Sequence, residues 1–290
     1  MTPTVLETPP AFREATDALR AEGHVVGLVP TMGALHPGHL ALVAEARRRG
    51  ATKVAVTIFV NPLQFDRADD LERYPRTFEA DLAACAEVGV DLVFAPAPGS
   101  MYPEGFQTHV EVGELSRALE GAHRPGHFQG VTTVVTKLLL ACGPCVAVFG
   151  RKDYQQWRIL ERMARDLGIP ATIVGHPIVR ERDGLAMSSR NRLLPPADRE
   201  RALAIAAGLR AAGEAWERGE RDAATLRQHV LTPVEVAFDR VDYVFLVDPE
   251  TLRESEGPVD RGLLVVAGHL GPVRLIDNLE LGVDPLPVTG

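Results

Sequence analysis

The chain has 290 residues and a formal net charge of −8 at pH 7, with 46% hydrophobic and 24% charged residues. This composition fits a globular protein of one large or two modest domains, and the acidic balance argues against a broad nucleic-acid-binding surface. No apolar run reaches the length of a membrane span, and the N-terminus lacks the basic and apolar regions of a secretory signal. We therefore expect a cytoplasmic enzyme with no membrane or nucleic-acid partner.

Apolar runs typical of strands alternate with helix-like runs up to about residue 175. Strands are expected at 25–29, 53–60, 91–95, 146–149 and 172–174, and helices at 38–49, 78–88, 130–140 and 154–167. Continuous apolar strands separated by helices indicate a parallel sheet covered on both faces, which is a doubly wound α/β fold. Ligands bind such sheets at the carboxyl ends of the strands, so the turns after residues 29, 60, 149 and 174 are the candidate sites.

The pattern changes near residues 176–180, where we place a domain boundary. Amphipathic helices are expected at 198–218 and 223–237, and a small mixed sheet at 242–247, 263–267 and 273–276. We expect residues 1–178 to form the first domain and residues 179–290 to form a smaller α+β domain.

Residues 30–39, with the sequence Pro-Thr-Met-Gly-Ala-Leu-His-Pro-Gly-His, stand between the first strand and the helix that follows. Such a turn offers backbone N–H groups and the positive end of a helix dipole, both suited to phosphate. His36 and His39 are three positions apart and project to the same side of a helix start. The alternative is a helix cap with packed histidines, because the spacing fits neither a dinucleotide fingerprint nor a P-loop.

Polar residues also follow the second and fourth predicted strands. Asn61 and Gln64 could hold a small polar substrate through their amides, although Asn61 could also form a simple turn with the proline after it. Lys152 follows Gly150 at a predicted helix start and suggests a phosphate contact, with Gln156 one turn further on. The segments 124–128 and 187–190 add basic and hydroxyl groups, and their simpler interpretations are a surface turn and a helix cap.

Cys142 and Cys145 match the CxxC redox pattern. A thioredoxin-like pair follows a strand and opens a helix, whereas this pair follows a predicted helix and precedes a strand. We therefore expect a helix–strand turn with buried thiols instead of a catalytic dithiol. Cys85 and the scattered histidines offer no recognisable zinc-ligand spacing.

Together, the segments 30–39, 59–65, 150–156 and 187–191 resemble the pantothenate synthetase (pantoate–β-alanine ligase) family, in the right order and spacing. The resemblance runs from about residue 20 to about residue 280. It places the chain in the nucleotidyltransferase superfamily, which shares the HxGH motif with class I aminoacyl-tRNA synthetases. It implies a Rossmann-like first domain, a second domain that acts as a lid, and a homodimer.

The resemblance implies ATP-dependent condensation of (R)-pantoate with β-alanine through a pantoyl adenylate, which yields pantothenate, AMP and pyrophosphate. Mg²⁺ would accompany ATP, with Asp81 as a protein contact. Catalysis is assigned to His36, His39, Lys152 and Arg190. ATP binding is expected from Met32, Gly33, Ala34, Leu35, His36, Pro37, Gly38, His39, Gly150, Arg151, Lys152, Asp153, Val179, Met187, Ser188, Ser189 and Arg190. Substrate binding is expected from Asn61, Gln64, Arg124, His127 and Gln156. Arg151 departs from the family pattern, which usually has glutamate or glutamine there.

Two alternatives remain open from the sequence. One is a transfer-RNA synthetase or a simple nucleotidyltransferase. The acidic chain and short C-terminal domain argue against transfer RNA, and a simple nucleotidyltransferase would need no second, amine-binding step. The other is a non-catalytic ATP-sensing module of the same fold, which would bind nucleotide without turnover.

Overall fold

The computed structural model describes residues 2–65 and 68–288, and the chain divides into two compact units. The first unit consists of Met1–Arg151 with Gln155–His176, and the second of Lys152–Tyr154 with Pro177–Gly290. Within the described part of the chain, no helix combines the length and the apolarity that crossing a bilayer requires.

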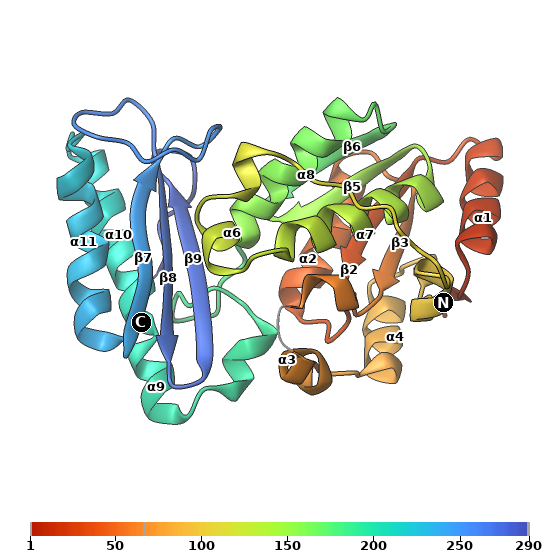
Figure 1. Cartoon of the computed structure of the whole chain (residues 1–290), viewed down its shortest axis with the longest axis horizontal. Helices are drawn as coiled ribbons and strands as arrows, with labels where there is room; N and C mark the ends of the chain where they lie inside the picture. Colours follow the sequence, from red (N-terminus) through yellow and green to blue (C-terminus); the bar gives the residue numbers. More distant parts are fainter. Residues whose placement is uncertain (1, 66–67, 289–290) are drawn as a thin grey trace. The chain divides into compact units, whose positions relative to one another are not determined.

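A six-stranded parallel sheet forms the centre of the first unit (Figure 1), with the order β1-β4-β3-β2-β5-β6. The strands are β1 (Thr4–Leu6), β2 (Val26–Thr31), β3 (Lys53–Ile58), β4 (Leu92–Phe94), β5 (Cys145–Gly150) and β6 (Ala171–His176). The predicted doubly wound parallel sheet is confirmed. β1 is an addition, because its short, largely exposed run carries no apolar signal in the sequence.

Helices cover both faces of this sheet. α1 (Pro9–Ala21), α7 (His127–Cys142) and α8 (Tyr154–Asp166) pack on one face, and α2 (Pro37–Arg48) and α4 (Phe78–Glu87) on the other. The unit also contains the short helices α3 (Ala68–Arg73), α5 (Pro98–Met101) and α6 (Glu120–His123) and the 3₁₀ turns η1 (Pro62–Gln64), η2 (Glu114–Ser116) and η3 (Arg151–Asp153). α1 was not predicted, and the four helices expected from the sequence correspond to α2, α4, α7 and α8.

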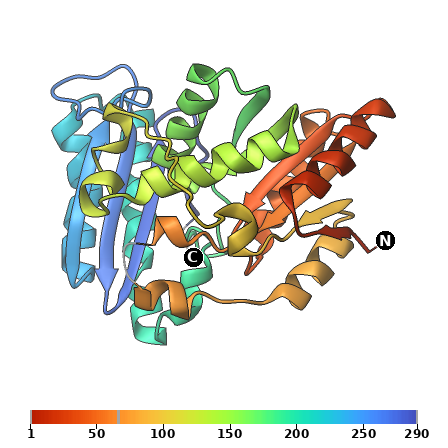
Figure 2. The same ribbon diagram turned by 45° about the vertical axis from the view of Figure 1, so that its right-hand side comes forward.

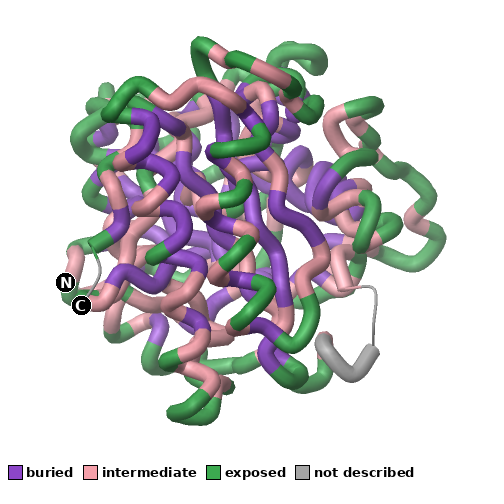
Figure 3. Tube along the Cα trace, turned by 90° about the vertical axis from the view of Figure 1, so that its left-hand side faces the viewer, coloured by how far each residue is buried: buried purple, intermediate pink, exposed green. Residues whose placement is uncertain are grey.

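Alternate residues of the strands supply two separate layers of core. Leu28 of β2 packs with residues of α1, α7 and α8, whereas its neighbour Val29 packs with residues of α2 and α4. In Figure 2, α1 and α7 lie along the same face of the sheet. Figure 3 shows the buried stretches of the trace in purple and the exposed turns in green. Burial on both faces explains why these strands have continuous apolar sequences.

The second unit contains a three-stranded sheet, drawn in blue in Figure 1. Its strands are β7 (Arg240–Val247), β8 (Leu263–Leu270) and β9 (Val273–Glu280), and its helical elements are η4 (Ser189–Leu193), α9 (Pro196–Arg201), α10 (Leu203–Glu217) and α11 (Ala223–Ala237). Side chains of α10 and α11, among them Leu209 and Leu226, pack with one face of the sheet to form the core of this unit.

Two details of this unit differ from the sequence prediction. The sheet is antiparallel throughout instead of mixed, since only the two residues Gly271 and Pro272 join β8 to β9. The single helix expected at 198–218 is divided at Ala202, where the Ile205 N–H bonds to the carbonyl three residues before it. Such a tightened turn interrupts an α-helix without changing its apolar face.

The cysteines lie where the sequence predicts a structural turn. Cys142 ends α7 and Cys145 begins β5, and both are buried free thiols, as is Cys85 on α4. The hydrogen bond between Cys142 and Cys145, together with burial, raises the pKa of the Cys145 thiol. Burial and the nearby Asp81 charge raise the pKa of Cys85 to about 11. Cys142 and Cys145 therefore form the helix–strand turn with buried thiols that the sequence predicts.

Candidate functional site

The strand order of the first unit reverses at β2, which pairs with β3 on one side and with β5 on the other. Because these three strands are parallel, their carboxyl ends lie at the same edge of the sheet. Open α/β sheets bind their ligands at such a reversal point. The predicted site segments 30–39 and 59–65, and the turn that begins at Gly150, all start from this edge.

Asp81 holds the loop after β2 in an unusual backbone conformation. Gly33 and Ala34 have φ angles of 82° and 51°, and the second is costly for alanine. The Asp81 carboxylate accepts hydrogen bonds from the backbone N–H groups of Ala34 at 3.0 Å and Leu35 at 2.8 Å. Thr77 Oγ1 donates to it at 3.2 Å, and Asp81 is 2% exposed. These contacts favour an anchoring role for Asp81 over the expected metal contact.

His36 and His39 open α2. His36 is the extended N-cap residue and Pro37 begins the helix. His39 Nδ1 accepts a hydrogen bond from the His36 backbone N–H at 3.4 Å, so the proton of a neutral His39 ring is on Nε2. The two rings are 4.0 Å apart between centroids. The helix N-terminus and an Nε2–H donor together suit a phosphate oxygen.

Asn61 is buried beneath Gln64. It is 1% exposed, and its Nδ2 donates to Gln64 Oε1 at 3.0 Å and to the Gly130 carbonyl at 3.1 Å. Its Oδ1 accepts from the Tyr102 hydroxyl at 2.7 Å and from the Leu63 N–H at 3.3 Å. Burial raises the pKa of Tyr102, which keeps that hydroxyl protonated as a donor. Asn61 therefore fixes the direction of the Gln64 amide.

The structure brings Arg124 and His127 to the same segment. His127 Nδ1 lies 2.9 Å from the Gln64 carbonyl, and Arg124 Nη2 donates to that carbonyl at 3.3 Å. A carbonyl only accepts, so His127 Nδ1 carries the proton, and Nε2 accepts from Arg124 Nη1 at 3.3 Å. Gln64, Arg124 and His127 thus form one contiguous group, as expected for residues with a shared role.

Gln155 fixes the segment that precedes Arg124. Its Nε2 donates to the carbonyls of Leu115 and Ala118, each at 2.8 Å, and its Oε1 accepts from the Glu120 N–H at 3.0 Å. The predicted residue Gln156 is half-buried beside it on the first turn of α8.

The turn after β5 forms η3. Its half-buried Lys152 has Nζ 4.0 Å from Asp153 Oδ1, the limit of an ion pair. The Arg151 guanidinium carbon is 6.0 Å from the centroid of the Trp157 ring, so this departure from the family pattern lies against an aromatic face. A Cβ added at Gly150 would meet no atom within 4 Å beyond its chain neighbours.

In the second unit, the predicted residues Val179 and Met187 are joined directly. The Met187 N–H bonds to the Val179 carbonyl at 2.9 Å. Ser188 caps η4, because its Oγ accepts from the Arg190 N–H at 3.3 Å. The cap that the sequence offered as the simpler interpretation is therefore real, and it sets the backbone that carries Ser189 and Arg190.

A family model described as pantoate-beta-alanine ligase matches residues 4–280. The chain belongs to the pantoate–β-alanine ligase family. The pantothenate synthetase of Myxococcus xanthus is 53% identical over 285 residues, 97% of each chain. A crystal structure of pantothenate synthetase from Thermus thermophilus has 46% identity and a TM-score of 0.89, and covers 97% of this chain and 100% of that one. The ligase from Francisella tularensis, complexed with beta-gamma ATP and beta-alanine, has 31% identity and a TM-score of 0.78 over 96% and 97% of the two chains.

The chain is therefore a pantoate–β-alanine ligase, and the activity predicted from the four motifs is confirmed. Family membership also decides against the transfer-RNA and non-catalytic alternatives. Three supporting residues of this ligase were not found from the sequence: Thr77 and Tyr102 contact the predicted site residues Asp81 and Asn61, and Gln155 fixes the segment that precedes Arg124. Tyr102 and Gln155 act through contacts 35 to 41 positions away in sequence, which no local spacing marks, whereas Thr77 lies only four positions before Asp81.

Proposed function

We propose that this ligase uses ATP to form a pantoyl adenylate. A carboxylate oxygen of pantoate attacks the α-phosphorus, the bond to the bridging oxygen of the β-phosphate breaks, and pyrophosphate leaves. The β-alanine amine then attacks the acyl carbon, the acyl–oxygen bond to AMP breaks, and the nitrogen loses a proton. The ligands named for the Francisella tularensis complex support ATP and β-alanine as ligands of this chain.

The observation that carries the proposal is the position of His36 and His39. They open α2 at the sheet edge where β2, β3 and β5 end, on a loop held by Asp81. Displacement at phosphorus depends on positioning and charge stabilisation more than on covalent help from the protein. N–H donors at this helix start would stabilise the charge that builds on the α-phosphate.

Pantoate would bind beside this loop. Gln64 follows β3, the neighbour of β2, and Asn61 fixes the direction of its amide. Gln156 stands after β5, the neighbour of β2 on the other side. Two amides on either side of the nucleotide loop suit the hydroxyl and carboxylate oxygens of pantoate. Arg124 and His127 complete this part of the site.

The second unit would supply the groups that hold the departing pyrophosphate. All four candidate residues lie in this unit. Lys152 stands in the part of η3 that belongs to it, and the other three are Ser188, Ser189 and Arg190. Since the candidate phosphate-binding residues are divided between the two units, the second unit would act as a lid that completes the site when nucleotide is bound.

Mg²⁺ would enter with ATP as part of the co-substrate, held mainly by phosphate oxygens. The Asp81 carboxylate accepts from two backbone N–H groups and a hydroxyl, which supports a role in holding the loop, and the Mg²⁺ dependence of Asp81→Asn tests whether it also contacts the metal. The homodimer implied by the family resemblance is part of the same proposal. Light scattering of the purified chain tests it directly, and a mass equal to that of one chain would reject it.

Positional isotope transfer tests the adenylate. Pantoate labelled with ¹⁸O in its carboxylate should place one label in AMP, and exchange of pyrophosphate into ATP should require pantoate but not β-alanine. Label in inorganic phosphate, or exchange that requires β-alanine, would reject the adenylate while leaving the ligase activity intact.

A further inference from the structure

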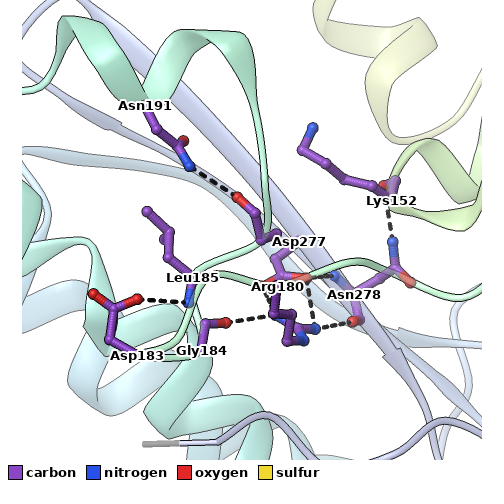
Figure 4. Close-up of polar contacts among 9 residues, drawn as sticks. Lys152, Arg180, Asp183, Gly184, Leu185, Asn191, Asp277 and Asn278 are labelled. Carbon is purple, nitrogen blue, oxygen red and sulfur yellow. Dashed lines mark hydrogen bonds and ion pairs between the residues drawn. The ribbon is translucent and has the colours of Figure 1, made fainter. Parts of the chain in front are cut away.

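Two adjacent residues of β9, Asp277 and Asn278, contact two separate segments of the proposed nucleotide site (Figure 4). All the residues involved belong to the second unit. Asp277 and Asn278 are each 3% exposed, so neither can meet a substrate directly. Their side chains act on other residues of the protein.

Asp277 forms a forked ion pair with Arg180. Arg180 Nη1 lies 2.7 Å from Asp277 Oδ2, and Nη2 lies 3.0 Å from Oδ1. The same guanidinium donates to the Gly184 carbonyl at 3.0 Å and to the Asn278 carbonyl at 3.3 Å. The side chains of Arg180 and Asp277 are 13% and 2% exposed. Only arginine can make such a planar, multiple contact, so the pair specifies a geometry and not merely a charge.

Arg180 begins a narrow loop whose two arms carry predicted ATP-binding residues. A β-bridge joins Arg180 to Ala186, and the Glu181 N–H bonds to the Leu185 carbonyl at 2.8 Å. Val179 precedes the bridge on one arm and Met187 follows it on the other. Fixing the Arg180 side chain to β9 therefore fixes the backbone that leads into η4.

Asn278 reaches the other segment. Its Nδ2 donates to the Lys152 carbonyl at 2.9 Å, and the Asn278 backbone N–H bonds to Asp277 Oδ1 at 2.8 Å. A hydrogen bond to the carbonyl of a lysine sets where its side chain begins. Lys152 and the loop at 179–187 thus share one attachment point on β9.

We propose that Asp277 and Asn278 are positioning residues that hold Lys152 and the 179–190 segment in register for nucleotide phosphate. This inference rests on the proposed function, since it gives those segments a purpose. Neither β9 residue touches ATP, and each acts through one intermediate, Lys152 or Arg180.

A double-mutant cycle on Asn278 and Lys152 tests the first contact. N278A should lower kcat/KM for ATP by about tenfold, as expected for a lost buried hydrogen bond. In a K152A background, N278A should lower kcat/KM for ATP by less than about threefold, because the lysine side chain that Asn278 positions has been removed. Equal losses in both backgrounds would overturn the inference, since a purely structural role is indifferent to Lys152.

A matched pair of isosteric variants tests the second contact. D277N and D242N each replace a buried carboxylate paired with arginine on the same three-stranded sheet. Both should lower the melting temperature, but only D277N should raise KM for ATP. R180K, which keeps the charge and loses the fork, should raise KM in the same way if D277N does not fold. The inference would be overturned if D277N, or R180K where D277N does not fold, had the same KM for ATP as D242N.

The roles proposed for the phosphate-binding residues fail in a different way. Wild-type activity in both K152A and R190A would reject those roles, and the positioning inference with them, while the isotope transfer decides the adenylate separately. Loss of activity in those two variants, with additive effects for N278A, would reject the positioning inference alone.

Discussion

Asp81 Oδ1 lies 2.8 Å from the backbone nitrogen of Leu35, although 46 positions separate the two residues. Through this contact and its partner at Ala34, a carboxylate on α4 determines the shape of a loop that precedes α2.

Asp81→Asn replaces one acceptor by a donor that faces a backbone N–H. We expect a loss of about 1–3 kcal/mol of unfolding free energy, a lower kcat and a higher KM for ATP. The Mg²⁺ concentration for half-maximal activity should not change. Asp91→Asn is the control, because Asp91 also accepts a backbone N–H, from Val54 at the amino end of β3. A shifted Mg²⁺ requirement at an unchanged KM for ATP would instead identify Asp81 as a metal contact.

His36→Ala and His39→Ala should each lower kcat by about 10²–10³, the typical effect of removing one donor to a developing anion. Unfolding free energy should change little, since neither ring belongs to a hydrophobic core cluster. His24→Ala is the control, because His24 precedes β2 at the opposite end of the strand and contacts Thr52. Pyrophosphate exchange measures the effect, and exchange at the wild-type rate in both variants would contradict the assigned roles.

Asn61→Asp keeps both acceptor contacts of Oδ1 but sets an oxygen against Gln64 Oε1 and the Gly130 carbonyl. Two acceptors facing each other repel, so the Gln64 amide should rotate. We expect KM for pantoate to rise by about tenfold, the cost of one lost hydrogen bond, with KM for ATP unchanged. Tyr102→Phe removes the contact on the other side of Asn61 and should have a smaller effect. Similar pantoate KM values in the two variants would show that the amide direction is unimportant.

Gly130→Ala tests the packing of α7 against η1. A Cβ at residue 130 would lie 2.1 Å from the Leu63 carbonyl oxygen and 2.7 Å from the Gln64 nitrogen. The backbone of η1 must move, at a cost of about 1–3 kcal/mol in unfolding free energy, and KM for pantoate should rise. Gly99→Ala is the control, because no atom lies within 4 Å of its added Cβ. Urea denaturation compares the two variants, and equal stability would contradict the packing argument.

Asp242 should make stability depend on acidic pH. Burial alone would raise its pKa, but hydrogen bonds from Arg274 and His269 and their charges outweigh burial and lower the pKa below 3.8. A lowered folded-state pKa stabilises the protein above the unfolded value, and this stabilisation is lost as pH falls through the folded one. The stability difference between the native chain and Asp242→Asn should therefore shrink from about pH 5 downwards. A difference that stays constant in urea titrations down to pH 3 would contradict this account.

Much of the first unit could be predicted because its signals are local. The alternation of buried strands with helices is a property of consecutive residues, and so is the histidine pattern at a helix start. The same applies to α11, whose bounds agree with the predicted 223–237. The two-residue Gly-Pro connection between β8 and β9 allows only antiparallel pairing, a signal that the apolar pattern of the strands does not carry.

The supporting contacts could not be predicted in this way. Asp81, Gln155 and Asp277 meet partners 35 to 97 positions away, at distances that only the folded chain defines. A carboxylate in a sequence has the same appearance whether it caps a loop, binds a metal or faces water. The family resemblance therefore indicates that Asp81 belongs to the site, but the residues that its carboxylate contacts could not be predicted.

The burial of Cys85, Cys142 and Cys145 has a practical consequence, since these are the three cysteines of the chain. Thiol-reactive dyes should leave the native protein largely unlabelled, so a cysteine introduced at an exposed position on each unit would react selectively. Exposed candidates are Leu140 on α7 and Val236 on α11. A dye pair at these positions would report, by energy transfer in solution, whether adding ATP and pantoate brings the two units closer together.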